Sequence, residues 1–260
     1  MVACLTIAGS DSGGNAGVQA DLRAYHAYGV HGCTVFTALT AQNPFEVSAI
    51  HRVPSDFVAA QLDAVLGVYD IRGLKTGMLA DPATIEIIAE KIREHREIAA
   101  VIDPVMIATS GARLISNDSI AALRKHLIPL ARIITPNIPE AEELTGRKIT
   151  GIESAENAAR EFCQKFATAV FIKGGHLDGA QSVDILCDES GVKRLILPRI
   201  KNPVSTHGTG CTFAAALSAE LALGRDLQKA TYGAKNHTHR AIAASCLVGN
   251  DCGVLGFVTD

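Results

Sequence analysis

The stretch LTIAGSDSGGNAGVQADLRAYHA (residues 5–27) consists of a short apolar run, a glycine-rich turn and a segment with helical periodicity. This order predicts a buried strand over Leu5–Ala8 that turns tightly into a helix over Ala16–Ala27. Short runs rich in Val, Ile and Leu alternate with longer helical segments along the rest of the chain. The alternation predicts an α/β fold in which helices cover both faces of a mostly parallel sheet.

The same periodicity gives bounds for the remaining elements. Further strands are predicted at Thr34–Ala38, Gly73–Thr76, Ala100–Ile102, Arg132–Thr135 and Ala169–Ile172. Further helices are predicted at Pro54–Val68, Pro82–His95, Asp118–Leu127, Pro139–Thr145, Ser154–Ala167, Thr212–Leu223 and Leu227–Ala244. Two late runs, residues 182–188 and 192–198, are joined by ESG, which predicts a hairpin that adds an antiparallel edge to the sheet. No internal repeat or long linker interrupts the pattern, so we expect residues 1–260 to form a single domain.

Composition excludes several classes of protein. The 260 residues are 48% hydrophobic and 20% charged, which is typical of a globular protein with a large core. A formal net charge of −3 gives no electrostatic footprint for nucleic acid or an anionic membrane. No run approaches the roughly 20 apolar residues of a membrane-spanning helix, and the N-terminus lacks the basic segment of a signal peptide. The seven cysteines form no paired CxxC motifs, so we expect neither a zinc site nor disulfides, and a reducing cytoplasm as the compartment.

Small or polar segments follow six predicted strands: GSDSGGNAG, TAQN, TGM, DPV, TPNIPEAEEL and KGGH. Because ligands of open α/β sheets bind beyond the carboxyl ends of the strands, these segments form the candidate site. The first segment lacks the Lys and Ser/Thr of a Walker-type loop, which excludes that class of phosphate site. Its glycines permit a ligand to approach the backbone, and Asp21, one helical turn after Gly17, could turn back toward the pocket. The alternative is a purely structural turn with an exposed Asp21.

Carboxylate and amide side chains gather after the fourth and fifth predicted strands. Asp103 ends the fourth strand, while Asn137 and Glu140 surround the start of the helix after the fifth. A hard cation such as Mg²⁺ prefers oxygen ligands and keeps several waters, which suits Asp103 and Glu140. The structural alternative is a capping interaction between Asn137 and Glu140. Lys173, after the sixth strand, could meet phosphate oxygens or could be an ordinary surface lysine.

The segment THGTGCT (residues 206–212) places Gly208, Thr209 and Gly210 directly before an apolar helix. Free backbone N–H groups and the macrodipole at a helix start stabilise an anion, and this arrangement suits a transferred phosphoryl group. The same field is expected to lower the pKa of the Cys211 thiol and to produce thiolate near neutrality. The alternative is a buried structural thiol.

Taken in order, AGSDSGGNAGVQADL, TALTAQN, GMLAD, DPVM, TPNIPEAEEL, KGGHL and THGTGCT resemble the hydroxymethylpyrimidine/phosphomethylpyrimidine kinases of thiamin synthesis, in the ribokinase-like superfamily. The resemblance covers about residues 3–245, and Cys in GTGC, where superfamily members generally have Asp, is typical of the pyrimidine kinase branch. It implies a three-layer ribokinase-like fold, a cytoplasmic homodimer, and the use of ATP and Mg²⁺. The implied reactions are phosphorylation of 4-amino-5-hydroxymethyl-2-methylpyrimidine and of its monophosphate to the diphosphate.

The resemblance also implies a role for each matching position. The residues implied to bind the pyrimidine are Gly9, Asp21, Gln42, Met78 and Val105. Those implied to bind the nucleotide are Asn137, Lys173, Thr206, Thr209 and Lys235, with Asp103 and Glu140 at the metal. The residues implied at the catalytic position are Gly208, Gly210 and Cys211.

The sequence departs from the family pattern at a few positions, and other functions are compatible with its motifs. Ser12 stands where the family usually has Pro, Asn15 stands where it has Gly, and the tail at 246–260 diverges from the usual ending. Pyridoxal kinases share the fold and are the first alternative. A cysteine-nucleophile transferase or hydrolase would need an oriented His beside Cys211, and His207 has no evident orienting carboxylate. A non-catalytic nucleotide-binding regulator is the remaining alternative.

Overall fold

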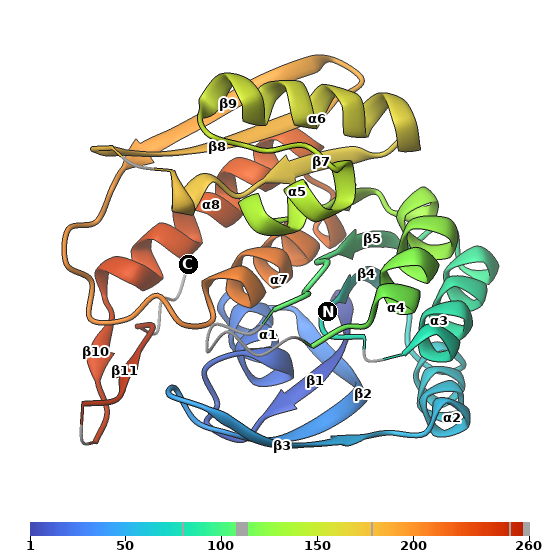
Figure 1. The fold of residues 1–260 in the computed structure, drawn as a ribbon. Helices are drawn as coiled ribbons and strands as arrows, with labels where there is room; N and C mark the ends of the chain where they lie inside the picture. The colour runs from blue at the N-terminus through green and yellow to red at the C-terminus, as the bar shows by residue number, and fades with distance from the viewer. Residues whose placement is uncertain (80, 108–113, 178, 250, 257–260) are drawn as a thin grey trace.

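A nine-stranded sheet forms the centre of the molecule (Figure 1). The computed structural model describes residues 1–79, 81–107, 114–177, 179–249 and 251–256, so that part of the divergent tail lies outside the described residues. The strand order is β3-β2-β1-β4-β5-β6-β7-β8-β9. The bounds are β1 (Ala3–Asp11), β2 (His31–Gln42), β3 (Val47–Arg52), β4 (Ile71–Thr76), β5 (Ala99–Ile102), β6 (Ile133–Ile134), β7 (Ala169–Ile172), β8 (Gln181–Asp188) and β9 (Gly191–Pro198). A separate small sheet pairs β10 (Cys246–Leu247) with β11 (Gly253–Val254).

The sheet is parallel in its middle and antiparallel at both edges. Strands β2, β1, β4, β5, β6 and β7 run parallel to one another. The β8–β9 hairpin then continues the sheet, with β8 antiparallel to β7. This confirms the predicted fold class and its late antiparallel edge. The second antiparallel edge, β3, has no signal in the sequence because its side chains are exposed or half-exposed and lack an apolar alternation.

Helices cover both faces of the sheet, as the sequence predicts. On one face lie α1 (Gly17–Ala27), α7 (Thr209–Ala222) and α8 (Leu227–Ala243). On the other lie α2 (Ser55–Leu66), α3 (Pro82–Glu94), α4 (Asn117–Ala122), α5 (Ile138–Thr145) and α6 (Ile152–Phe166). The helix expected over Asp118–Leu127 changes pitch, because a π-helical turn (Leu123–Leu127) and a 3₁₀ turn (Ile128–Leu130) follow α4. None of the helices in the described ranges has the length and apolar character needed to cross a bilayer.

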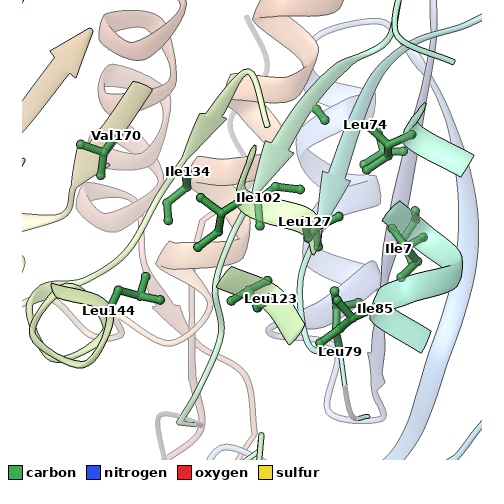
Figure 2. Close-up of a cluster of buried hydrophobic side chains, with 14 of the residues drawn as sticks. Ile7, Leu74, Leu79, Ile85, Ile102, Leu123, Leu127, Ile134, Leu144 and Val170 are labelled. Carbon is green, nitrogen blue, oxygen red and sulfur yellow. The ribbon is translucent and has the colours of Figure 1, made fainter. Parts of the chain in front are cut away.

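The central strands are buried on both faces, which explains their unbroken apolar sequences. Successive side chains of a strand point to opposite faces. In β5, accordingly, Val101 packs under α7 and α8, whereas Ile102 joins the larger core on the other face. Figure 2 shows part of this larger core, in which side chains of the central strands, such as Ile7 and Val170, meet those of the helices around them. Layers on both faces therefore fix the sheet, and the carboxyl ends of its parallel strands all meet at one edge.

Helix α7 begins at Thr209 rather than at Thr212. Gly208 is its N-cap and has a φ of +85°, a left-handed conformation that favours glycine. Thr209, Gly210 and Cys211 therefore form the first turn of the helix, although the apolar pattern places them before it. Their position matters because the backbone N–H groups of a first turn have no partners within the helix.

Candidate active site

One cavity of about 990 Å³ lies at the carboxyl ends of the parallel strands. It collects segments from every predicted strand end. Of the predicted site residues, those that line it are Gly9, Gln42, Met78, Asp103, Val105, Asn137, Glu140, Lys173, Thr206, Gly208, Thr209, Gly210, Cys211 and Lys235. Asp21 is absent from this lining. The spatial convergence predicted from the strand-end motifs therefore exists for all of them except Asp21.

The turn after β1, residues 11–17 and hereafter the glycine loop, is organised by Asp11. Its Oδ1 accepts a hydrogen bond from the Gly13 N–H at 2.8 Å, and its Oδ2 accepts from those of Asn15 at 2.9 Å and Ala16 at 2.8 Å. Burial alone would raise the pKa of Asp11, but His207 and these amides outweigh it, and the pKa is lowered. Gly17 has a φ of +57°, and a Cβ there would stand 2.3 Å from the Gly9 carbonyl oxygen. The loop therefore closes tightly over the end of β1.

Asp21 is fully buried and does not line the cavity, contrary to the expectation that its carboxylate turns toward the pocket. The Lys75 Nζ lies 3.0 Å from Asp21 Oδ1 and 2.9 Å from Oδ2, and Thr6 donates to Oδ2 at 2.5 Å. Both charged side chains are fully shielded from solvent. The physical reason is that a carboxylate buried under a sheet requires a cation, and Lys75 on β4 provides it. It is Lys75, rather than Asp21, that reaches the cavity lining.

The residues predicted to bind the pyrimidine lie at the ends of β1, β2 and β4. Gln42 is half-buried, and its Oε1 accepts a bond from Thr40 Oγ1 at 3.2 Å. Within the described part of the chain, the Gln42 Nε2 donates no hydrogen bond. The Met78 sulfur is 3.4 Å from the place of a Cβ on Gly9, so the thioether packs on the end of β1. This end of the cavity combines an apolar surface with an amide that can donate and accept.

On the opposite side, two carboxylates share one lysine. The Lys173 Nζ is 2.8 Å from Asp103 Oδ1 and 4.0 Å from Glu140 Oε2. Thr135 Oγ1 also donates to Asp103 Oδ1, at 3.0 Å. Burial raises the pKa of Glu140 to about 7 although Lys173 opposes the shift. Burial would lower the pKa of Lys173, but Asp103 and Glu140 outweigh it and raise it.

The capping alternative for Asn137 and Glu140 is correct, and it coexists with their place in the cavity. Asn137 Oδ1 accepts from the Glu140 N–H at 2.9 Å, and Glu140 Oε2 accepts from the Asn137 N–H at 2.8 Å. These reciprocal bonds form a capping box at the start of α5. Both side chains nevertheless line the cavity. The capping box thus fixes the Glu140 carboxylate in the site.

Lys235 lines the cavity, but its amine is already engaged. Its Nζ donates to Asp184 Oδ2 at 2.5 Å and to the Ser182 carbonyl at 3.0 Å. Asp184 Oδ1 in turn accepts from the Gly174 N–H at 2.7 Å. The network joins α8 and β8 to the turn that carries Lys173.

The N-terminal end of α7 and the residues just before it, residues 206–211 and hereafter the α7 turn, present unpaired donors to the cavity. Among the described residues, the backbone N–H groups of Gly210 and Cys211 have no acceptor, whereas the Thr209 N–H reaches the Thr206 carbonyl at 3.4 Å. Lys173 Nζ would lie 3.4 Å from a Cβ on Gly210. A cation and two free donors thus face the same place, as an anion requires.

The expectation of a Cys211 thiolate near neutrality is wrong. Burial raises the pKa of Cys211, and the charge of Lys75 and the Gly17 N–H offset only part of that rise. Burial therefore outweighs the groups that lower this pKa, and the side chain is a protonated thiol at neutral pH. His207 Nε2 lies 3.8 Å from Asp11 Oδ2, and within the described ranges neither ring nitrogen has a hydrogen-bond partner that would orient it as the base of a cysteine nucleophile.

Three residues of the site are missing from the sequence prediction: Asp11, Lys75 and Asp184. Lys75 and Asp184 each stand inside an apolar strand run, IRGLKT and QSVDILCD. A charged side chain is almost never fully buried unless it is paired, so such a position is a signal of a buried ion pair. The signal indicates a partner but does not say which residue it is.

Comparison with known sequences places the chain in a family. Residues 11–256 match the family model described as phosphomethylpyrimidine kinase. The thiamine biosynthesis bifunctional protein of Geobacter sulfurreducens is 48% identical over 254 residues, 98% of this chain and 52% of that protein. The chain thus spans about half the length of that relative. A hydroxymethylpyrimidine/phosphomethylpyrimidine kinase of Rhizobium meliloti is 46% identical over 243 residues, 93% of this chain and 90% of that protein.

Solved structures of two kinases have the same fold as this chain. An ADP complex of Bacillus subtilis pyridoxal kinase has a TM-score of 0.91 at 36% identity and covers 99% of this chain and 97% of its own. The phosphomethylpyrimidine kinase of Clostridium difficile 630 has a TM-score of 0.82 at 40% identity and covers 93% of this chain and 100% of its own. Because the family model matches nearly the whole length of this chain, the chain belongs to the phosphomethylpyrimidine kinase family.

Proposed function

We propose that this chain uses ATP to phosphorylate the hydroxymethyl group of 4-amino-5-hydroxymethyl-2-methylpyrimidine, and then the resulting monophosphate. One observation carries the proposal: a single cavity joins the amide and thioether surface at Gln42 and Met78 to the unpaired N–H groups of the α7 turn. An alcohol held at the first place can meet a phosphoryl group held at the second. Bringing two reactants together in this way supplies much of the catalysis in phosphoryl transfer.

The acceptor end suits an aminopyrimidine. The Gln42 amide can accept from an exocyclic amino group and donate to a ring nitrogen at the same time. Met78 offers a polarizable, adaptable surface to the ring. Val105 lines the same cavity from the segment after β5. We expect these three residues to orient the hydroxymethyl group toward the α7 turn.

The donor end suits the charge of a transferred phosphoryl group. The N–H groups of Gly210 and Cys211 and the ammonium of Lys173 are fixed before the reaction begins. Fixed donors aimed at developing charge stabilise a transition state without reorganisation at the moment of transfer. In this role Lys173 and the two amides hold the phosphoryl oxygens.

The carboxylates fit a magnesium ion bound together with ATP. The hydrogen bonds of Asp103 in the described part of the chain use Oδ1, which leaves Oδ2 for a cation or its waters. The described residues hold no group of three or more His, Cys, Asp or Glu side chains that could bind a metal. Asp103 and Glu140 therefore match the mode in which Mg²⁺ takes one or two carboxylates and shares the phosphates. The ion supplies neutralisation of phosphate charge when bound.

Cys211 in this proposal aligns the acceptor hydroxyl while keeping its own proton. Phosphoryl transfer proceeds through a loose transition state, so the hydroxyl proton can leave late and no preformed thiolate is needed. Cys211→Ala should lower kcat and leave the KM of the pyrimidine nearly unchanged. Near-normal turnover of this variant would show that Cys211 does not align the acceptor hydroxyl, while the kinase function would stand.

The function is tested by ADP release with Mg²⁺-ATP and three acceptors: the pyrimidine, its monophosphate and pyridoxal. The expected result is the highest kcat/KM with the two pyrimidines. Gln42→Ala should raise the KM of the pyrimidine, whereas Gln228→Ala, an exposed glutamine on α8, is the matched control. No ADP release above background with the pyrimidines would refute the proposal.

Pyridoxal kinase is the second candidate. The observation that favours it is the TM-score of 0.91 to the B. subtilis pyridoxal kinase, which exceeds the 0.82 to the C. difficile phosphomethylpyrimidine kinase. A higher kcat/KM with pyridoxal than with the pyrimidine would establish it in place of the first.

A further inference from the structure

The glycine loop and the α7 turn pack directly against each other, although they come from opposite ends of the chain. The Asn15 carbonyl oxygen touches Gly208, where a Cβ would stand only 1.9 Å from it. The Gly17 N–H is near enough to the Cys211 thiol to lower its pKa, although burial outweighs this effect. Glycine at 208 is required for this approach as well as for its positive φ.

A polar contact joins the two turns beside this packing. His207 is only 9% exposed, and its Nε2 lies 3.8 Å from Asp11 Oδ2. The same oxygen accepts the N–H groups of Asn15 and Ala16. The Asp11 carboxylate therefore holds the glycine loop with its hydrogen bonds and lies beside the α7 turn at His207.

The contact between the glycine loop and the α7 turn contains buried polar atoms that make no hydrogen bond to any described residue. Within the described ranges, His207 Nδ1, His207 Nε2 and Asn15 Nδ2 are buried without a hydrogen-bond partner. Burying such groups destabilises a fold, so their presence calls for a reason other than stability. At 3.8 Å the contact between His207 and Asp11 is longer than a hydrogen bond, and a small movement of either turn would close it.

The glycine loop is also tied to the acceptor end of the cavity. Ser12 Oγ accepts from the Gln42 N–H at 2.8 Å and donates to the Gln42 carbonyl at 2.8 Å. A connected path thus runs from Gln42 through Ser12 and Asp11 to His207, the residue next to Gly208. The first step is a pair of hydrogen bonds, the second is the peptide bond between adjacent residues, and the third is the 3.8 Å contact between His207 and Asp11.

We infer that His207 is a positioning residue that couples the glycine loop to the α7 turn, so that the pyrimidine and ATP each strengthen the binding of the other. This inference rests on the proposed function. Pyrimidine bound at Gln42 would order the glycine loop, and Asp11 would then draw His207 and the α7 turn into the geometry that binds phosphate. Coupling of two sites through such an element is reciprocal.

The coupling is measured as the ratio of the Kd of the pyrimidine without and with saturating Mg²⁺ and AMP-PCP, by isothermal titration calorimetry. We expect the wild-type protein to bind the pyrimidine about fivefold or more tightly with the nucleotide present. His207→Ala should bring this ratio close to one. The Kd of the pyrimidine alone should change little, because His207 acts on the turn and not on the ring.

Two further variants separate positioning from folding. His207→Gln keeps a donor that can reach Asp11 and should restore part of the coupling. His26→Ala removes an exposed histidine of α1 and should leave the ratio unchanged. Thermal unfolding of each variant reports stability separately, and a structural role for His207 would lower the midpoint without changing the ratio in protein that remains folded.

The outcomes distinguish this inference from the proposed function. An unchanged ratio in His207→Ala, or a ratio of one in the wild-type protein, overturns the coupling and leaves the kinase function standing. Absence of pyrimidine binding to the wild-type protein under both conditions overturns the proposed function, and the coupling with it.

Discussion

Two of the lysine–aspartate pairs at the cavity differ in their access to solvent. In the closed pair, Lys75 and Asp21 are both fully shielded, and Asp21 also accepts the Thr6 hydroxyl. In the open pair, the Lys173 side chain is 19% exposed, and Glu140 stands 4.0 Å away as a second carboxylate. The closed pair satisfies its own charges, whereas the open pair carries an extra carboxylate that needs a cation or a proton.

This difference shows that a lysine–aspartate pair can be purely structural in one place and accessible to a ligand in another. Buried ion pairs lose so much hydration that breaking one partner is severe, and the closed pair therefore serves the structure of the cavity floor. The open pair keeps access to the ligand, and the raised pKa of Glu140 records the crowding of its charges, with burial as the largest cause. We therefore expect the chemistry to involve the pair that is incompletely neutralised.

The largest expected effect is the loss of the closed pair. Lys75→Met leaves the Asp21 carboxylate buried without its cation, and we expect a loss of about 3–5 kcal/mol in the free energy of unfolding. Lys173→Met should lose less, because water reaches that pair. Urea unfolding followed by circular dichroism measures both.

A double variant, Asp21→Leu with Lys75→Met, is the control for the closed pair. It removes both charges and should recover much of the stability lost by Lys75→Met alone. Equal losses of unfolding free energy in Lys75→Met and Lys173→Met would show that solvent access does not distinguish the two pairs.

The next effect is on catalysis and concerns the open pair. Lys173→Met should lower kcat/KM about 100- to 1,000-fold, the magnitude found when one donor to transition-state charge is removed. The ADP-release assay measures it. Lys148→Met, whose side chain is 87% exposed, is the matched control and should keep full activity. Retention of activity by Lys173→Met would place the phosphoryl-binding charge elsewhere.

The open pair should also show a dependence of stability on pH. Burial raises the pKa of Glu140 from 4.5 to about 7, so the folded protein keeps a proton that the unfolded chain releases between these values. The resulting stability is complete below about pH 4.5 and is lost as pH rises through 7, by at most about 3 kcal/mol. Urea unfolding of magnesium-free protein across this range measures it.

Glu140→Gln removes the titrating group and should flatten the profile in that window. The difference between wild type and variant is the relevant quantity, because other groups also titrate there. A parallel course of the two profiles would contradict the assignment to Glu140.

The smallest effect concerns the cap that holds Glu140 beside the open pair. Asn137→Ala should destabilise the protein by about 1 kcal/mol through loss of the N-cap bond. Asp226→Ala removes the corresponding cap of α8, where Asp226 Oδ1 accepts from the Lys229 N–H at 2.9 Å. The two variants should lose similar stability in urea, but only Asn137→Ala should also lower ADP release. Equal activities would mean that the cap serves the helix alone.

Most of the fold could be predicted from the sequence because it depends on local patterns. Apolar runs of strand length and helical periodicity identify the parallel strands and the helices that cover them. The edge strand β3 could not be predicted, since its side chains are largely exposed and carry no alternation. The start of α7 could not be placed either, because Gly208, Thr209 and Gly210 have low helix propensity and only the folded turn shows where the helix begins.

The candidate site divides in the same way. The sequence by itself determined which segments meet, because the carboxyl ends of parallel strands share one edge and each of these ends carries a polar or glycine-rich motif. Only the tertiary structure decided how the charges pair: Asp21 with Lys75, and Lys235 with Asp184. It also decided that the Cys211 thiol keeps its proton, since burial outweighs the charge of Lys75 and the Gly17 N–H. The physical reason is that desolvation and ion pairing depend on neighbours distant along the chain, which periodicity and local motifs do not specify.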